Sequence, residues 1–467
     1  MSIKIGLEIH CQINALKSKL FCSCSTDYRS KMPNTNICTI CMGLPGSLPL
    51  LNKEAVRYAI TIALALNCKI PDRIMFYRKN YFYPDLPKNF QITQYNAYGI
   101  SSIGYEGKVM IEDKEIRIRR IQLEEDPGRL VYDSKNYTYV DYNRAGIPLV
   151  EIVTEPDFDD PKLVRIFLNK LSSILTHLNI DPELEGAVRC DANVSIDEGN
   201  RVEIKNVNSF KDVEKALLFE ISRQKSLLSK GISVQAETRH WDDKRKVTIQ
   251  SRSKEEEEDY RYFPEPDIPS LIIDRDIIDK VKSIMPELPD ERKERLLKIG
   301  LSENVAQVLV DDKVLADIFD DALNYYNNAR EIANWIVSDL KGYIERLGFD
   351  KVKVTSKHIA ELAKMVDNAI INRTVAKQIL SEIIKTGEMP SLIAKRLNAE
   401  QISDKEELIN IIDKVFEEDK KAVEDAMRNE KAINFLLGKV MKHTKGKADP
   451  KIALELIKRK ISILLER

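Results

Sequence analysis

Three runs of this sequence alternate apolar with polar residues, and the polar members of each run include charged side chains. In the run at 3–10, Leu7 and Ile9 fall on one side, whereas Glu8 and His10 fall on the other. Successive side chains of a β-strand point to opposite faces, so a period of two predicts strands. The same alternation recurs at 188–196 and 201–210. Antiparallel sheets can be packed on one face and wet on the other, so we expect a sheet whose charged face holds a ligand.

Charged residues gather in the stretch at 117–157, between short apolar runs. The acids are Glu124, Glu125, Asp126, Glu151, Glu155 and Asp157, and the bases are Arg117, Arg119, Arg120 and Arg144. The run at 149–153 places Glu151 among aliphatic and β-branched residues, which is typical of a strand. A carboxylate there is costly unless a cation, a metal ion or hydrogen-bond donors meet it. A single Glu would indicate a buried ion pair or a solvent-facing edge, but the clustering favours a metal or phosphate site.

Glu8 and His10 lie two residues apart, so both side chains point to one face of the predicted first strand. They could be two metal ligands or an acid–base pair. A lone His is more often a hydrogen-bonded polar residue, so His10 by itself does not establish a site.

Four of the seven cysteines form two close pairs: Cys22 with Cys24, and Cys38 with Cys41. Two tight turns that each present two thiolates suit tetrahedral Zn²⁺. In a cytosolic chain this spacing favours structural zinc; unligated thiols and a redox pair are the alternatives. The other cysteines lie among apolar residues and are expected to be small core residues. These are Cys11, Cys68 and Cys190.

The chain has 467 residues, so more than one domain is expected. Strand patterns and glycines thin out from about residue 276, where Lys, Glu, Ile and Leu follow helical periodicity. A second change near 398–401 sets off a last helical segment. The predicted organisation is a domain at 1–275, a helical domain at 276–398 and a tail at 399–467. Helices are predicted within the first domain at 53–67, 163–177 and 211–230.

The tail carries a local excess of positive charge. The net charge of the whole chain is −1, so any attraction to nucleic acid must come from a patch. Residues 438–467 contain nine Lys and Arg against three acids, and Lys442, Lys445 and Lys447 are among them. This excess predicts a phosphate-binding patch, with a merely soluble helical tail as the alternative.

Several common signatures are missing from the sequence. No P-loop or dinucleotide-binding glycine pattern occurs, so any nucleotide site is of another type. No G-x-S-x-G turn and no Cys in a hydrolase setting predicts a hydrolytic nucleophile. No run of about 18 apolar residues and no signal peptide occurs, which predicts a cytoplasmic protein without a membrane span. The segment at 78–88 interleaves aromatic and basic residues, which suits a nucleotide base or a tRNA end, with loop packing as the alternative.

Taken together, these segments resemble the GatB family, which belongs to the three-subunit tRNA-dependent amidotransferases (GatCAB). The matching stretches run in family order across nearly the whole chain. They are GLEIH (6–10), SKLFC (18–22), PGSLPLLN (45–52), RKNYFYPDLPK (78–88), LEEDPG (123–128), VDYNRAGIPLVEIVTEPD (140–157), RCDANVS (189–195), EIKNVNSF (203–210), ETRHW (237–241), DYRYFPEPD (259–267) and VMKHTKGKADP (440–450).

The resemblance implies an α+β fold with three parts. These are an N-terminal cradle with a mostly antiparallel sheet and flanking helices, an all-α domain and a small helical YqeY-like tail that touches tRNA. It also implies ATP-dependent conversion of misacylated Glu-tRNA(Gln) or Asp-tRNA(Asn) to the amide. ATP phosphorylates the side-chain carboxylate of the tRNA-bound amino acid, and ammonia displaces phosphate. A GatA-type amidase subunit would make that ammonia from glutamine, and a GatC-type small subunit would wrap around both.

Site residues follow from the resemblance as expectations. His10, Glu125 and Glu151 would hold Mg²⁺, with Glu8 and Glu124 beside them. The other expected contacts are Lys79, Arg189 and Lys205 to phosphate, and Asp191, Asn193 and Ser209 to the nucleotide or the aminoacyl end. Lys442, Lys445 and Lys447 would contact tRNA. The four cysteines occur in only some members of the family, so their zinc would be structural.

The sequence departs from the family pattern at two places. Gln122 stands where the family usually has His, and Arg129 stands where it usually has Lys. The related GatE family carries a large insertion, for which the short path from 259–267 into the helical region leaves no room. A non-catalytic tRNA-binding zinc protein is the remaining alternative, and the intact acids, with His10 and Lys205, argue against it.

Overall fold

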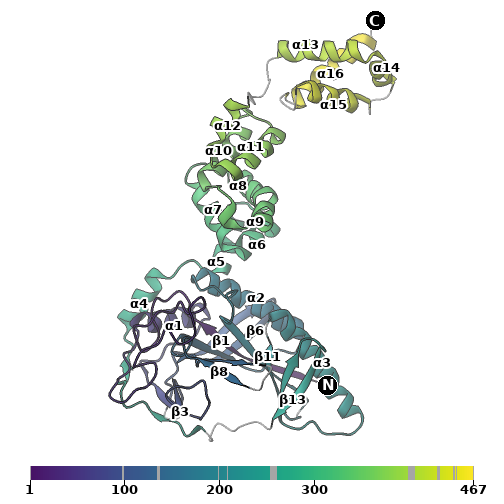
Figure 1. Ribbon diagram of the computed structural model, residues 1–467. Helices are drawn as coiled ribbons and strands as arrows, with labels where there is room; N and C mark the ends of the chain where they lie inside the picture. The colour runs from purple at the N-terminus through teal and green to yellow at the C-terminus, as the bar shows by residue number, and fades with distance from the viewer. Residues whose placement is uncertain are drawn as a thin grey trace. The chain divides into compact units, whose positions relative to one another are not determined.

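The computed structural model covers residues 1–467 and forms two compact units, Met1–Pro289 and Asp290–Arg467 (Figure 1). The residues described are all except 1, 97–98, 134–136, 198, 208, 253–259, 398–404, 429–431, 445–447, 449 and 466–467. The first unit combines a large sheet with helices, and the second unit is helical. The predicted α+β class is confirmed.

An eight-stranded sheet forms the centre of the first unit. Its strands are β1 (Ile3–Gln12), β5 (Gly104–Ile111), β6 (Lys114–Glu125), β9 (Pro148–Thr154), β10 (Val188–Ile196), β11 (Val202–Val207), β12 (Glu237–Asp242) and β13 (Val247–Arg252). Their order across the sheet is β13-β12-β11-β10-β1-β9-β6-β5. Every neighbouring pair is antiparallel except β11 with β12. The runs predicted as strands all belong to this sheet, and β1 lies near its middle.

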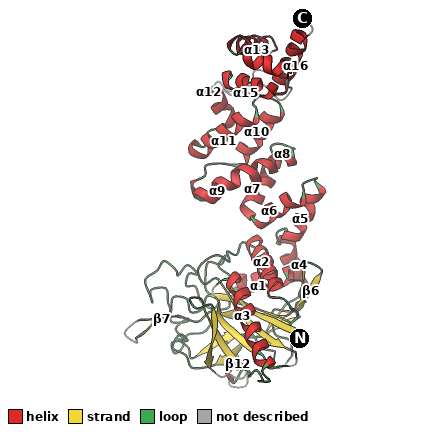
Figure 2. Ribbon diagram, turned by 90° about the vertical axis from the view of Figure 1, so that its right-hand side faces the viewer, coloured by secondary structure: helices red, strands yellow, loops and turns green. Residues whose placement is uncertain are grey.

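Three helices pack against one face of this sheet: α1 (Lys53–Ala65), α2 (Pro161–His177) and α3 (Phe210–Ser229) (Figure 2). Each begins at a residue whose side chain accepts a backbone N–H of the first turn, as helix caps do. The apolar side of β1 is buried in the same core as these helices, with Leu7 and Ile9 at most 1% exposed. Since side chains alternate along β1, Glu8 and His10 lie on the opposite, polar face.

Shorter strands complete the first unit. A three-stranded sheet contains β3 (Tyr77–Asn80), β4 (Phe90–Thr93) and β14 (Phe263–Pro264), and two pairs join β2 (Arg73–Ile74) to β15 (Leu271–Ile272) and β7 (Arg129–Tyr132) to β8 (Thr138–Asp141). β4 contacts β6 of the large sheet. The guanidinium of Arg78 donates to both oxygens of the buried Glu265 carboxylate, at 2.7 and 2.9 Å. This ion pair fixes the segment around β14 to β3.

The second unit contains two separate apolar cores, one within 296–394 and the other within 408–461. Its helices are α5 (Pro289–Lys298), α6 (Glu303–Asp311), α7 (Lys313–Leu323), α8 (Ala329–Asn334), η2 (Trp335–Leu340), α9 (Lys341–Leu347), η3 (Phe349–Lys351), α10 (Ser356–Asp367), α11 (Arg373–Thr386), α12 (Pro390–Arg396), α13 (Lys405–Glu418), α14 (Lys420–Arg428), α15 (Ile433–His443) and α16 (Pro450–Leu465). The predicted boundary near 398 falls between the two cores, at residues outside those described.

The first unit ends later than the predicted boundary at 275. The helix α4 (Arg275–Ile284) follows that boundary, but its Val281 is 2% exposed and belongs to the core of the first unit. No described helix combines the length and the apolar character that crossing a lipid bilayer requires.

Candidate functional site

Three strands bring one imidazole and three carboxylates together on the polar face of the sheet. His10 on β1 is paired in register with Glu151 on β9, and its Nε2 is 3.9 Å from Glu151 Oε2. The same nitrogen is 3.8 Å from Glu8 Oε1 and 3.7 Å from Glu124 Oε1, which comes from β6. The structure thus gathers four of the predicted site residues. We call Glu8, His10, Glu124 and Glu151 the acidic cluster.

Repulsion between carboxylates dominates the electrostatics of the acidic cluster. Burial, reinforced by the charges of Glu8 and Glu124, raises the pKa of Glu151 to about 7. Burial also acts to raise the pKa of Glu8, but attraction from His10 and from nearby lysines outweighs it and the net shift is downward. Carboxylates this close are all ionised together only when a cation offsets their charge.

The donors of the acidic cluster fit a divalent cation. Glu8, His10 and Glu151 each offer one ligand atom, and these atoms lie within 4.8 Å of one another. Octahedral Mg²⁺ holds its ligands at about 2.1 Å and separates opposite ligands by about 4.2 Å, so small side-chain adjustments suffice. The distances from His10 Nε2 to the three carboxylates are longer than hydrogen bonds, so these groups do not already satisfy one another.

Two lysines border the acidic cluster. Lys205 on β11 donates to Asp191 on β10 at 3.1 Å, and the two residues hold each other on the polar face. Lys79 on β3 places its Nζ 4.5 Å from the ring centre of Tyr260. Both lysines act to lower the pKa of Glu8. They are therefore close enough to the acidic cluster to contact a phosphate bound there.

Arg189 and Asn193 continue the polar face along β10. Arg189 Nη2 donates to Asp126 Oδ1 at 2.6 Å, and the Asp126 side chain is fully buried. Burial acts to raise the pKa of Asp126, but Arg189 and Arg144 outweigh it and hold that pKa below its usual value. Among the described residues, Asn193 Oδ1 is buried without a hydrogen-bond partner. Buried polar atoms are usually paired, so this oxygen is available to a ligand.

Glu125 differs from the expectation, because the structure does not bring it to the acidic cluster. It follows Glu124 on β6, and adjacent residues of a strand face opposite sides. The Glu125 carboxylate contacts Lys88 Nζ and accepts the backbone N–H of Ile92 at 3.0 Å. Lys88 and Glu125 line a cavity of about 310 Å³ on the side of the cysteines. The predicted grouping of Glu125 with His10 is thereby corrected to Glu124.

Ser209 is likewise engaged elsewhere. Its Oγ accepts the backbone N–H of Asp212 at 3.1 Å and donates to Asp212 Oδ2 at 2.6 Å, so the hydroxyl caps α3. In the tail, Lys442 is exposed on α15. Lys445 and Lys447 lie outside the described residues.

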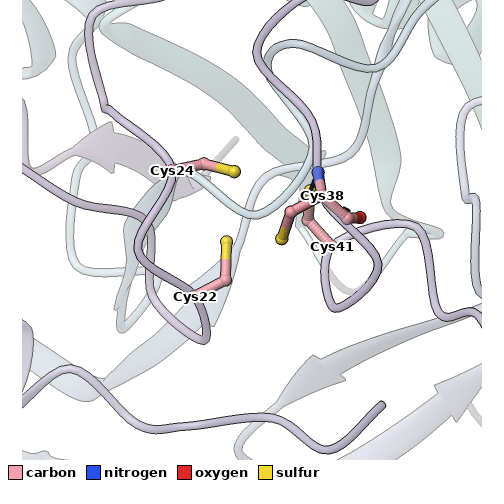
Figure 3. A group of neighbouring side chains, drawn as sticks. All are labelled: Cys22, Cys24, Cys38 and Cys41. Carbon is pink, nitrogen blue, oxygen red and sulfur yellow. Dashed lines mark hydrogen bonds between the residues drawn. The ribbon is translucent and has the colours of Figure 1, made fainter. Parts of the chain in front are cut away.

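Four thiols form a second candidate metal centre (Figure 3). The sulfurs of Cys22, Cys24, Cys38 and Cys41 come from two loops and lie within 4.8 Å of one another. Tetrahedral Zn²⁺ with bonds of about 2.3 Å spaces sulfurs by about 3.8 Å, so the set fits zinc. The hydrogen bond from the Cys22 thiol is the main cause that lowers the pKa of Cys41 to about 5, and the Cys38 N–H adds to it at 3.1 Å. Cys41 is thus predisposed to be a thiolate ligand.

The remaining cysteines are buried in the core of the first unit, as predicted from their apolar neighbours. They are Cys11, Cys68 and Cys190. Burial raises the pKa of Cys11 to about 12, so its thiol stays protonated.

Two residues near the site carry contacts that sequence patterns did not assign. Gln12 Nε2 donates to Asp126 Oδ2, and Arg29 Nη2 donates to Gln12 Oε1 at 2.7 Å. Arg120 Nη2 lies 3.7 Å from Glu151 Oε1. Gln12 extends the alternation of Glu8 and His10 by one step, so the strand pattern could have identified it. The position of Arg120 depends on the pairing of β6 with β9, which has no signal in the sequence.

Two family models match the chain. The model described as the GatB/GatE catalytic domain matches residues 3–279, and the model described as the GatB domain matches residues 317–461. The first match contains the acidic cluster and the four cysteines, and the second contains the exposed Lys442.

Full-length relatives are all named as the GatB-type component of aspartyl/glutamyl-tRNA(Asn/Gln) amidotransferase. The protein from Sulfolobus acidocaldarius is 50% identical over 99% of this chain and 100% of its own length. The proteins from Saccharolobus solfataricus and Thermotoga maritima are 48% and 44% identical, over 99% and 97% of this chain and 100% and 98% of their own lengths. With matches of this extent, the chain belongs to the GatB family of aspartyl/glutamyl-tRNA(Asn/Gln) amidotransferase subunits.

Proposed function

We propose that this chain is the subunit of a glutamine-dependent carbon–nitrogen ligase that activates Glu or Asp carried by a misacylated tRNA. ATP is the phosphoryl donor, and the side-chain carboxylate of the tRNA-bound amino acid is the acceptor. Membership of the GatB family supports this reaction class. The observation that carries the proposal is the convergence of Glu8, Glu124 and Glu151 on His10, bordered by lysines, on the polar face of the sheet.

The first step brings two anions together, the triphosphate and the carboxylate. Bound Mg²⁺ would offset part of this charge and hold the reacting groups in line. Glu8, His10 and Glu151 would hold the ion, with Glu124 beside them. The three strands that carry these residues are neighbours in one sheet, so the ligands are held by a rigid framework rather than by loops.

Cations held by their own counter-ions would receive the phosphates. Lys205 is held by Asp191, and Arg189 is held by Asp126, so both need little rearrangement when a nucleotide binds. Lys79 would approach from β3. The acyl phosphate that forms would then be attacked by ammonia at its carbonyl carbon. The carbon–oxygen bond to phosphate breaks, and amide and phosphate leave.

Ammonia and tRNA would come from outside this chain. A GatA-type amidase subunit would supply the ammonia from glutamine and a GatC-type small subunit would complete the complex, consistent with the missing hydrolase signatures here. Lys442, Lys445 and Lys447 would contact the tRNA through phosphates. Cys22, Cys24, Cys38 and Cys41 would hold a structural Zn²⁺. The substrates are aminoacylated tRNAs, so the enzyme would work in the cytoplasm.

The test uses the full chain purified with both partner subunits. ATP cleavage and amide formation are measured with Glu-tRNA(Gln) and with Asp-tRNA(Asn), and glutaminase activity is measured in the same samples. Glu151→Gln and His10→Ala should each lower ATP cleavage and amide formation by about 100-fold or more and leave glutaminase activity in place.

Glu155→Gln is the matched control. Glu155 directly follows β9, but it is partly exposed and paired with Arg119 at 2.7 Å, away from the acidic cluster. This variant should keep wild-type activity. Full activity of the Glu151 variant, or ATP cleavage that does not depend on misacylated tRNA in the wild type, would refute the proposal. A tRNA-binding scaffold would show no such ATP cleavage at all.

A further inference from the structure

Lys19 is a buried lysine without a carboxylate partner. Its side chain is 0% exposed and is among the largest fully buried side chains of the described residues. Its Nζ donates to Asn36 O at 2.9 Å and lies 3.9 Å from Cys41 Sγ. None of the carboxylates in the described part of the chain forms an ion pair with it. A buried ammonium is costly unless negative charge offsets it, and the sulfur of Cys41 is the group in contact that can carry such charge.

We propose that Lys19 is the fixed counter-cation of the four-cysteine metal centre, a proposal that rests on the zinc site proposed above. Four thiolates carry more negative charge than one Zn²⁺ neutralises, and the excess is costly in a poorly solvated interior. Groups that contact metal ligands from outside tune how tightly the metal is held. Lys19 is therefore a positioning residue for this centre, one that acts through Cys41.

The backbone holds Lys19 between both pairs of cysteines. Its N–H donates to Cys24 O at 2.9 Å, and the N–H of Leu20 donates to Gly146 O at 2.9 Å. A Cβ added at Gly146 would meet Lys19 Cδ at 3.4 Å and Cys41 Cβ at 3.7 Å. The stem of the lysine thus fills the space beside Gly146, and its ammonium cannot turn to solvent without leaving this packing. The charge is built into the centre.

The first test measures how tightly the full chain holds zinc. Lys19→Met removes the charge and keeps the length of the side chain, and Lys17→Met removes the charge of an exposed lysine two residues earlier. Zinc content and zinc transfer to a coloured chelator are measured under reducing conditions. Lys19→Met should hold zinc about 10–100-fold more weakly than the wild type, and Lys17→Met should not differ from it. Unchanged zinc affinity in Lys19→Met would overturn the proposal. A wild type that holds no zinc would instead refute the zinc site itself.

The second test separates charge from packing and from hydrogen bonding. A lysine that merely fills space would shift the unfolding midpoint equally with and without zinc when replaced by Met. A counter-cation should give a loss confined to the zinc-loaded form, with the metal-free Met variant at least as stable as the metal-free wild type. Lys19→Gln keeps a donor for Asn36 O without the charge, so it should weaken zinc binding as Met does. Wild-type affinity in the Gln variant, or a Met variant that is equally destabilised or does not fold without zinc, would overturn the proposal.

Discussion

At the scale of single residues, Asp126 shows how a buried carboxylate positions a functional cation. Its side chain is fully buried, and it accepts hydrogen bonds from Arg189 and Gln12 while Arg144 lies 3.9 Å away. A carboxylate at this depth is costly unless cations and donors meet it. The guanidinium of Arg189 is thereby held in place on the polar face before any ligand arrives.

Asp126→Asn should destabilise the first unit through this pair. The substitution leaves Arg189 without its counter-ion, and the free energy of unfolding should fall by about 2–3 kcal/mol, less than for a fully buried pair because Arg189 is half-exposed. Asp157→Asn is the control, since its partner Arg117 is exposed, and it should cost less than about 1 kcal/mol. Urea unfolding of the full chain measures both. Equal losses would show that burial of Asp126 does not matter.

The two neighbouring acids Glu124 and Glu125 mark the limit of prediction at this scale. Alternation along a strand already indicates that only one of them can face His10. Which one does so depends on the register of β6 against β9, where Gln122 is paired with Glu151. Register is a non-local property, so the sequence could supply the candidates but not the choice. The family resemblance predicted Glu125, and the geometry brings Glu124.

At the scale of elements, α10 begins with an unusual capping box that makes it sensitive to pH. The Thr355 N–H donates to His358 Nδ1 at 3.0 Å, which requires that this nitrogen be unprotonated. Burial lowers the pKa of His358, against opposing contributions from Glu361 and the Gly387 backbone. The folded state therefore favours the neutral ring, and the unfolded state binds the proton more readily.

Stability of the helical unit should fall as pH drops below about 6.5, the ordinary pKa of His. Above that value the ring is neutral in both states and the stabilisation is complete. Below it the unfolded state is protonated first, and up to about 1.4 kcal/mol is lost for each pH unit until the folded pKa is reached. His358→Gln places the usual capping-box residue there and should remove this part of the slope. Unfolding midpoints of both proteins at several pH values measure it, and identical slopes would refute the role of His358.

The cysteine loops are joined to the segment that leads into β9. Asn36 N–H donates to the buried Asn143 Oδ1 at 2.7 Å, and Asn34 Nδ2 donates to Val140 O at 2.9 Å. The same segment ends at β9, the strand of Glu151. A metal that ties the two cysteine loops together therefore also supports one strand of the acidic cluster.

Removal of zinc by a chelator should loosen both segments together. Hydrogen–deuterium exchange of the full chain should rise at 17–44 and also at 140–147, because hydrogen bonds join them, while α3 should be unaffected. Exchange is compared with and without chelator under reducing conditions. A rise confined to 22–41 would show that the metal centre and the acidic cluster are independent.

At the scale of the whole molecule, composition revealed where the architecture changes but not where each core ends. Alternation identified the strands, since it is a local property. The order β10-β1-β9-β6 depends on pairing between residues more than a hundred positions apart, which no local pattern contains. In the same way, helical periodicity from residue 276 indicated a helix and suggested that a new domain begins there. Only tertiary packing assigns α4 to the first unit.

Two truncated chains should distinguish these boundaries, one ending at 289 and one at 275. α4 begins at Asp274, whose side chain accepts the Ile277 N–H at 2.9 Å, and buries Val281 in the first core with Ile277 and Ile278 packed beside it. Loss of this apolar contact should make the shorter chain about 2–4 kcal/mol less stable, since burial of one Val or Ile side chain contributes about 1.5–3 kcal/mol and these are buried to different degrees. Urea unfolding in the presence of zinc measures the difference. Val281→Ala in the full chain is the matched control and should cost about 1–2 kcal/mol without removing the helix. Equal stability of the two truncated chains would place the boundary at 275, where the composition changes, and would mean that α4 rests on the first core without stabilising it.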